Sequence, residues 1–339
     1  MIKLYMLFLI VSIFAFAGEP DNFSGRNTPP QNEIVNQYVQ ARLVSIADTH
    51  NKSNKDKTKC DNEEIEKHLE DTFDRNWPDV YGLKWEAKTD GPENFDNSIL
   101  KGTMRSQFMV PSITLRLNGK NYSVGLDKLD HLFSHGYLYW KIIGKDPKMP
   151  KEKILQALQF GTAQEEGPWG LKAAGQKSYG DMAANYLGLA FWKDLWDGSP
   201  PFFACVEGQL IIKKQFKIED YFNASVDEAI NCNSYASQEM ASTIIQRTEV
   251  LNRKCPIDPG VCKDLNKTIS ENYQSYILHP LCRGITSNQV EKPSDLTVKD
   301  ILDGGSALVS GGGNFLKLIF PPAKMKVIEK GPPPATGVR

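Results

Sequence analysis

Two adjacent carboxylates end a predicted helix in the middle of the chain. Glu165 and Glu166 follow the apolar-periodic segment 151–164 and stand before Gly167-Pro168, where a helix has to stop. The negative end of the helix dipole disfavours acids here and raises a carboxyl pKa. A raised pKa suits a general acid near neutral pH. Glu166, or Glu165 beside it, is therefore the candidate acid, and two solvated surface charges are the plain alternative.

A third acid, Asp181, opens the next segment, which carries no charge from 182 to 192. Ser178 with an acid three residues later resembles a capping box, which alone could explain both residues. Asp181, Asn185 and Gly188 also share one helical face. Such a stripe on an apolar helix could line a substrate groove, so Asp181 is the second candidate for a catalytic or positioning role.

Two histidines form a third candidate site. His131 and His135 are spaced four residues apart, and Asp127 lies one turn earlier, which is a possible metal-binding face. The glutamate of an H-E-x-x-H motif is missing from "HLFSH". Histidines hydrogen-bonded in the core are therefore the favoured interpretation, and a place in the same cleft as the glutamates is the third.

The elements that must position these residues are mostly helices. Helical periodicity predicts helices over 33–47, 63–77, 126–144, 151–164, from about 178 onward, and 234–251. Alternating residues around Asn118-Gly119 predict a β-hairpin over 112–124, and a second hairpin turns at Glu207-Gly208. The glycine-rich "WGLKAAGQKSYG" (169–180) is predicted as a turn or hairpin between two helices.

Residues 1–17 have the charged start, apolar run and A-x-A end of a secretory signal peptide. A disordered lead (18–32), a single domain (33–300) and a glycine- and proline-rich tail (301–339) are expected to come after it. The apolar run is too short for a permanent membrane span. A net charge of −1 gives no indication of nucleic-acid binding.

The six cysteines all follow the predicted signal peptide, and an even number in an oxidising compartment favours disulfides. Sequence does not choose among fifteen pairings. A local bridge between Cys255 and Cys262, across a turn-rich loop, is one expectation. No pair of cysteines has the CxxC spacing of a structural zinc site.

The order of Glu-ending helix, short hairpin and buried helix in "QEEGPWGLKAAGQKSYGDMAANYLGLAFW" resembles the catalytic core of the lysozyme superfamily. The segments "DKLDH" and "SYGDMAANYLG" also resemble a group of exported bacterial proteins with DKxxH and SYxDxxANYxG motifs. The chain is similar as well to lysozymes of predatory bacteria that prefer deacetylated peptidoglycan. Gly-Pro-Trp follows the glutamates, where the superfamily has small polar residues, so both glutamates stay candidates.

The resemblance implies an α+β, mainly α-helical fold: a lysozyme-like core with short β-hairpins and added helices. It implies a secreted or periplasmic, monomeric glycoside hydrolase that cleaves peptidoglycan, without cofactor or metal and without a membrane or nucleic-acid partner. Glu166 or Glu165 would protonate the glycosidic oxygen, and Asp181 would position water or stabilise charge. The residues expected to bind substrate are Trp169, Ser178, Tyr179, Asn185, His131 and His135.

Two alternatives belong to other classes of protein. One is a metal-dependent envelope hydrolase that uses Asp127, His131 and His135. The other is a non-catalytic envelope-binding protein, in which every acid is a cap or a surface charge.

Overall fold

The computed structural model describes residues 28–55, 58–75, 99–103, 112–167, 170–172, 174–250 and 254–285. The predicted signal peptide, residues 18–27 of the lead and the tail 301–339 lie outside these residues. Residues 28–32 of the lead are described, and the Gln31 N–H donates to Thr114 O at 2.8 Å.

The fold is mainly helical with three small antiparallel sheets, as the α+β prediction required. The α-helices are α2 (Asn32–Ser53), α3 (Asn62–Glu70), α5 (Asp127–Asp130), α6 (Gly136–Ile142), α7 (Lys151–Glu166), α8 (Tyr179–Asp197), α9 (Gln238–Val250), α10 (Pro259–Thr268) and α11 (Glu271–Ile277). The sheets pair β1 (Ser112–Leu117) with β2 (Lys120–Gly125), β3 (Gln176–Ser178) with β6 (Asn233–Tyr235), and β4 (Phe203–Val206) with β5 (Gln209–Ile212). The shorter turns are η1 (Asp71–Arg75), η4 (His131–His135), η5 (Ile218–Asp220) and η6 (Ala224–Val226).

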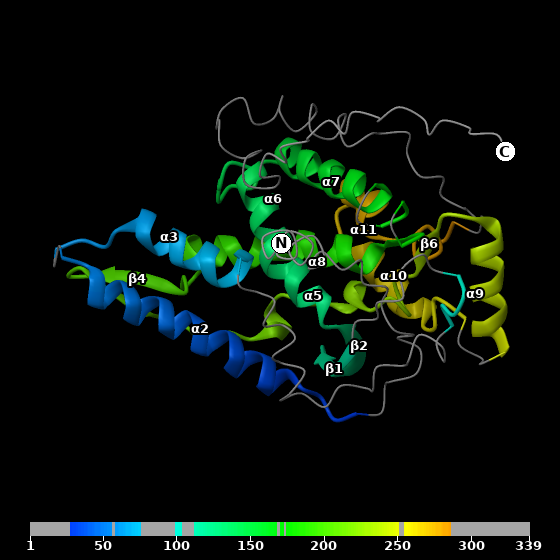
Figure 1. Cartoon of the computed structure of the whole chain (residues 1–339), viewed down its shortest axis with the longest axis horizontal. Coiled ribbons are helices and arrows are strands. Elements are labelled where there is room, and N and C mark those ends of the chain that lie inside the picture. Colours follow the sequence, from blue (N-terminus) through cyan, green and yellow to red (C-terminus); the bar gives the residue numbers. More distant parts are fainter. Residues whose placement is uncertain are drawn as a thin grey trace, which may run out of the picture.

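Helix α8 runs through the middle of the molecule and contacts α5, η4, α6, α7 and α11 (Figure 1). Its uncharged stretch is buried, with Phe191 fully covered and Trp192 1% exposed. The Trp192 indole N–H donates to the carbonyl of Phe133 at 2.8 Å. The prediction of a buried helix here is confirmed, and its burial explains the run without charge.

The segment predicted as one helix over 126–144 contains a π-helical turn. Residues 127–142 are helical, but η4 holds the backbone in a wider turn from His131 to His135. Such turns occur mostly as single insertions and frequently at functional sites. Just beyond it, Gly136 lies so close to Gly188 of α8 that a Cβ at 136 would be 2.7 Å from the Gly188 Cα. Glycine at both positions therefore lets the two helices touch backbone to backbone.

Both predicted hairpins outside the acidic segment are confirmed. Asn118 and Gly119 have φ angles of 49° and 81°, the left-handed values that a type I′ turn needs, between β1 and β2. Glu207 and Gly208, with φ angles of 48° and 72°, turn the chain between β4 and β5 in the same way.

Of the two forms predicted for 169–180, a turn or a hairpin, the described residues form turns. The chain makes successive turns, in which Leu171 N–H donates to Glu165 O at 2.7 Å and Ala174 N–H to Gly170 O at 2.8 Å. Gly170 is pressed onto the end of α7, where a Cβ would lie 2.0 Å from the Glu165 carbonyl oxygen. The described residues of this segment contain no strand that pairs with β3, which pairs instead with the distant β6.

The six cysteines form three pairs with disulfide geometry: Cys60–Cys205, Cys232–Cys255 and Cys262–Cys282. The expected local bridge between Cys255 and Cys262 is therefore wrong. Cys262 belongs to α10, which begins at Pro259 and turns this side chain toward Cys282. None of the helices within the described ranges is long and apolar enough to cross a membrane.

Candidate functional site

A lysine without solvent exposure lies at the meeting point of three carboxylates. The Lys128 ammonium is 3.3 Å from Asp127 Oδ2 and 3.0 Å from Glu228 Oε1, and it also contacts Asp181 Oδ1. These acids come from α5, from the loop after η6, and from the first turn of α8. Asp181 is 13% exposed and Glu228 is 5% exposed. The site is thus a buried ionic cluster that ties three segments together.

The two adjacent glutamates have different surroundings. Glu165 is 5% exposed, and its Oε2 accepts the backbone N–H of Ser178 at 3.3 Å. Glu166 is 23% exposed and forms an ion pair with Lys177 at 3.0 Å. The structure therefore places Glu165 with Asp181, and Glu166 outside that group in a pair of its own.

The environments of Glu165 and Asp181 push their pKa values in opposite directions. Burial, and then the negative charge of Asp181, holds the pKa of Glu165 well above its ordinary value. Burial also works against the charge of Asp181, but His131 and Lys128 outweigh it and lower the pKa of Asp181. Two neighbouring carboxyl groups whose pKa values are shifted apart in this way are the pattern of an acid and an anionic partner.

Glu165 and Asp181 line the same small cavity. Its volume is about 20 Å³, which is enough for one water molecule. The residues around it are Glu165, Gly170, Ala174, Gln176, Ser178, Asp181 and Glu228.

Ser178 caps α8, but it does more than a capping box requires. Its Oγ accepts the Asp181 N–H at 3.0 Å and also bonds to Glu228 Oε1. Its own N–H, which a complete capping box would direct to residue 181, donates to Glu165. The cap therefore connects Glu165, Asp181 and Glu228.

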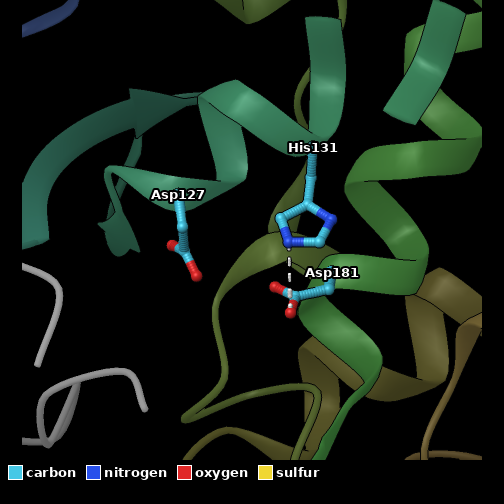
Figure 2. Close-up of side chains that lie close together, drawn as sticks. All are labelled: Asp127, His131 and Asp181. Carbon is cyan, nitrogen blue, oxygen red and sulfur yellow. Dashed lines mark ion pairs between the residues drawn. The ribbon is translucent and has the colours of Figure 1, made fainter. Parts of the chain in front are cut away.

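The stripe of Asp181, Asn185 and Gly188 faces the π-helical turn rather than an open groove. His131 points toward Asp181 (Figure 2), and its Nε2 lies 3.3 Å from Asp181 Oδ2. His131 Nδ1 donates to Asn185 Oδ1 at 2.8 Å. The ring of His135 stacks on that of His131 with 4.5 Å between centroids. Burial lowers the pKa of His135 to about 3, so this ring is neutral.

Tyr179 and Asn185, both predicted to bind substrate, have almost no exposed surface. Tyr179 is 2% exposed, with its ring edge-on to His279 at 5.3 Å, so stacking of this ring on a sugar is not supported. Asn185 is 1% exposed and is occupied by His131. Trp169 lies outside the described residues.

Sequence reasoning gave no role to Lys128 or Glu228. Lys128 stands inside "DKLDH", and its position next to Asp127 and one turn before His131 was the available signal. Glu228 accepts hydrogen bonds from Gln176 Nε2 at 3.4 Å and Asn233 Nδ2 at 2.6 Å. Nothing local to "VDEAIN" indicates that this acid returns to α8.

Asp127, His131 and Asp181 offer ligand atoms within 4.8 Å of one another (Figure 2). His135 of the expected metal face is not in this group. The Lys128 ammonium already contacts both carboxylates, so a metal ion would have to displace a buried cation. The donor set therefore fits a lysine-centred cluster better than a metal centre.

No family model, curated protein or solved structure matches the chain.

Proposed function

We propose that the protein is a glycoside hydrolase that cleaves the glycan strands of peptidoglycan, with Glu165 as the general acid. The observation that carries the proposal is the pairing of Glu165 and Asp181 at one cavity, with pKa values shifted in opposite directions. Of the two adjacent glutamates, Glu165 is chosen because Glu166 is paired with Lys177.

In the proposed reaction Glu165 gives its proton to the glycosidic oxygen as the bond to the anomeric carbon breaks. The leaving sugar gains a hydroxyl group, and the other sugar becomes an oxocarbenium-like centre that water attacks. The carboxylate of Asp181 stabilises the positive charge and takes the proton that the water loses. Because the cavity admits only a water-sized group, the sugar rings lie outside it.

The resemblance to the lysozyme superfamily supports the same reaction. A helix that ends in the acid (α7) and a buried helix that carries Asp181 in its first turn (α8) are both present. Between them, the β3–β6 pair takes the place of the expected hairpin. Three disulfides agree with the proposed secretion to an oxidising compartment.

The test is digestion of native and N-deacetylated cell-wall sacculi in water labelled with heavy oxygen. We expect soluble muropeptides whose new reducing ends carry one labelled oxygen, and the better substrate identifies the preferred acetylation state. Equal rates with and without a chelator are expected. Loss of activity that an added divalent metal restores would favour the metal-dependent alternative, and sacculi that bind the protein but stay intact would favour the envelope-binding one.

A further inference from the structure

Lys128 is not among the residues that line the cavity, but it contacts Asp181, which does line it and is the proposed anionic partner of Glu165. Its side chain has no solvent exposure, and its ammonium faces Asp127, Asp181 and Glu228. A lysine ammonium has three N–H donors and no acceptor, so the three carboxylates match its full capacity. A buried charge with this many partners is expensive to build, because each ion loses its water.

Glu228 gives Lys128 a fixed attachment to the rest of the fold. Ser178, Gln176 of β3 and Asn233 of β6 all hydrogen-bond to the Glu228 carboxylate, so this loop residue is attached to the small β3–β6 sheet. Lys128 thereby links that sheet to the first turn of α8. Its position is tightly limited, since a Cβ at Gly180 would lie 2.8 Å from Lys128 Cε and 3.1 Å from Glu228 Cγ.

We propose that Lys128 is a positioning residue that holds Asp181 at the cavity as an oriented carboxylate, while Glu228 holds Lys128. The inference rests on the proposed function, in which Asp181 is the anionic partner of Glu165. Lys128 acts through Asp181, and Glu228 acts through Lys128. His131 contacts Oδ2 of Asp181 and Lys128 contacts Oδ1, so each oxygen of this carboxylate has its own partner.

Several titratable groups face Asp181 and influence its ionisation. They are Lys128, Asp127 and Asp130 from α5, His131 and His135 from η4, Glu165 from α7, and Glu228 from the loop after η6. Lys128 and His131 favour the ionised form of Asp181, whereas the four other acids, when charged, oppose it, and the His135 ring is neutral. Removing Lys128 alone therefore leaves an excess of negative charge.

The test compares Glu228→Gln with the double variant Lys128→Met/Glu228→Gln. The glutamine removes the buried acid that Lys128 would otherwise leave unpaired, so the double variant has no stranded charge at residue 228. The two proteins differ only at Lys128. We expect the double variant to lose roughly 10²-fold in kcat/KM on sacculi, as misplaced catalytic groups do. Its acid limb should move to higher pH, because Asp181 then binds its proton more readily.

A purely structural lysine would lower thermal stability without moving that limb. Lys214→Met is the matched control. Lys214 pairs at 2.6 Å with Asp194, which lies on α8 as Asp181 does, and Lys214 is not part of the ionic cluster around Lys128. It is expected to leave the pH profile unchanged. Equal acid limbs in Glu228→Gln and the double variant would overturn the inference.

A second measurement does not depend on activity. The aspartate carboxyls of Glu228→Gln and of the double variant are labelled with carbon-13, and the Asp181 signal is assigned by adding Asp181→Asn to each. We expect Asp181 to titrate at higher pH in the double variant than in Glu228→Gln, because Lys128 is one of the two cations that lower the pKa of Asp181. Equal titration midpoints in the two proteins would overturn the role of Lys128. Wild-type protein that leaves all sacculi intact would instead remove the proposed function, with the carboxyl titration still deciding whether Lys128 controls Asp181.

Discussion

At the residue scale, Glu165 and Glu166 show how two identical neighbours acquire different chemistry. Glu165 is turned into the protein beside Asp181, whereas Glu166 is partly exposed and pairs with the buried Lys177. The last turn of α7 decides this, because consecutive helical residues point in directions about 100° apart. The choice between the two glutamates therefore depends on which side of α7 faces the protein interior. Two adjacent glutamates in a sequence do not show this.

Glu165 should also make stability depend on pH. Its pKa is raised in the folded protein, so between the ordinary value of 4.5 and the raised value the folded state binds more protons than the unfolded state. The free energy of unfolding then falls as pH rises, by up to about 1.4 kcal/mol per pH unit. Glu165→Gln removes this titration, so its stability should fall less steeply in urea unfolding series above about pH 5. Parallel slopes for the two proteins would contradict a raised pKa.

The residues that sequence did reveal at this scale were the conspicuous ones. Acids at a helix end and histidines at helical spacing are unusual enough to be noticed in a sequence. Two of these residues, Asp181 and His131, do contact each other, with 3.3 Å between Oδ2 and Nε2. Lys128 was not singled out, because a lysine on a predicted helix is ordinary until the fold shows that it has no solvent exposure. Its role depends on Glu228, one hundred residues later.

At the scale of elements, α8 and the η4–α6 segment are the frame of the site. Gly188 sits against the η4 backbone, and a Cβ there would lie 2.2 Å from the Leu132 carbonyl oxygen. That oxygen belongs to the same turn as His131 and His135, so the contact fixes the distance between α8 and the histidine segment.

Gly188→Ala should therefore destabilise the fold although alanine favours helices. The helix propensity gain is about 1 kcal/mol, and overpacking against backbone costs about 1–3 kcal/mol, so a net loss is expected. Chemical unfolding measures it, with Ala190→Ser on an exposed position of α8 as a control that stays within about 0.5 kcal/mol of wild type. A Gly188→Ala protein more stable than wild type would show that the helices can separate freely.

Elements with local signals were predictable, and those with distant partners were not. The β1–β2 hairpin is encoded by Asn118-Gly119, whose turn geometry brings its own strands together. The β3–β6 pair joins two three-residue strands more than fifty residues apart, so neither carries a pattern that identifies the other. The glycines at 170 and 175 indicated a turn, but they carried no information about the strand with which the next residues pair.

At the scale of the whole molecule, one main core extends from α2 to Cys282. Figure 1 shows α2, α3 and β4 at one end of the molecule and α9 at the other, with α8 between them. Cys60–Cys205 joins residues 145 apart in sequence at the α3 end. The other two bridges close short loops in the C-terminal part, near the segment that carries Glu228.

The pairing of the cysteines is a prediction at this scale, because sequence alone left fifteen connectivities open. A peptide map of unreduced protein should contain Cys60–Cys205, Cys232–Cys255 and Cys262–Cys282. Reduction should destabilise the protein, by about 2–5 kcal/mol for each native bridge in a small secreted domain. Five or six free thiols in denatured, unreduced protein would contradict the pairing.

The most direct test of the proposed hydrolase is the rate at which Glu165→Gln and Glu166→Gln release soluble muropeptides from sacculi. Glutamine keeps the shape of the side chain but removes its acidic proton. Glu165→Gln should be folded and slower by roughly 10²–10⁴-fold, the usual contribution of a general acid. Glu166→Gln removes an ion-pair partner of Lys177, which is only 6% exposed, so it should lower stability. It takes no proton donor from the cavity, so its rate should stay close to that of the wild type. A Glu165→Gln protein that digests sacculi at the wild-type rate would contradict the assignment of Glu165 as the acid.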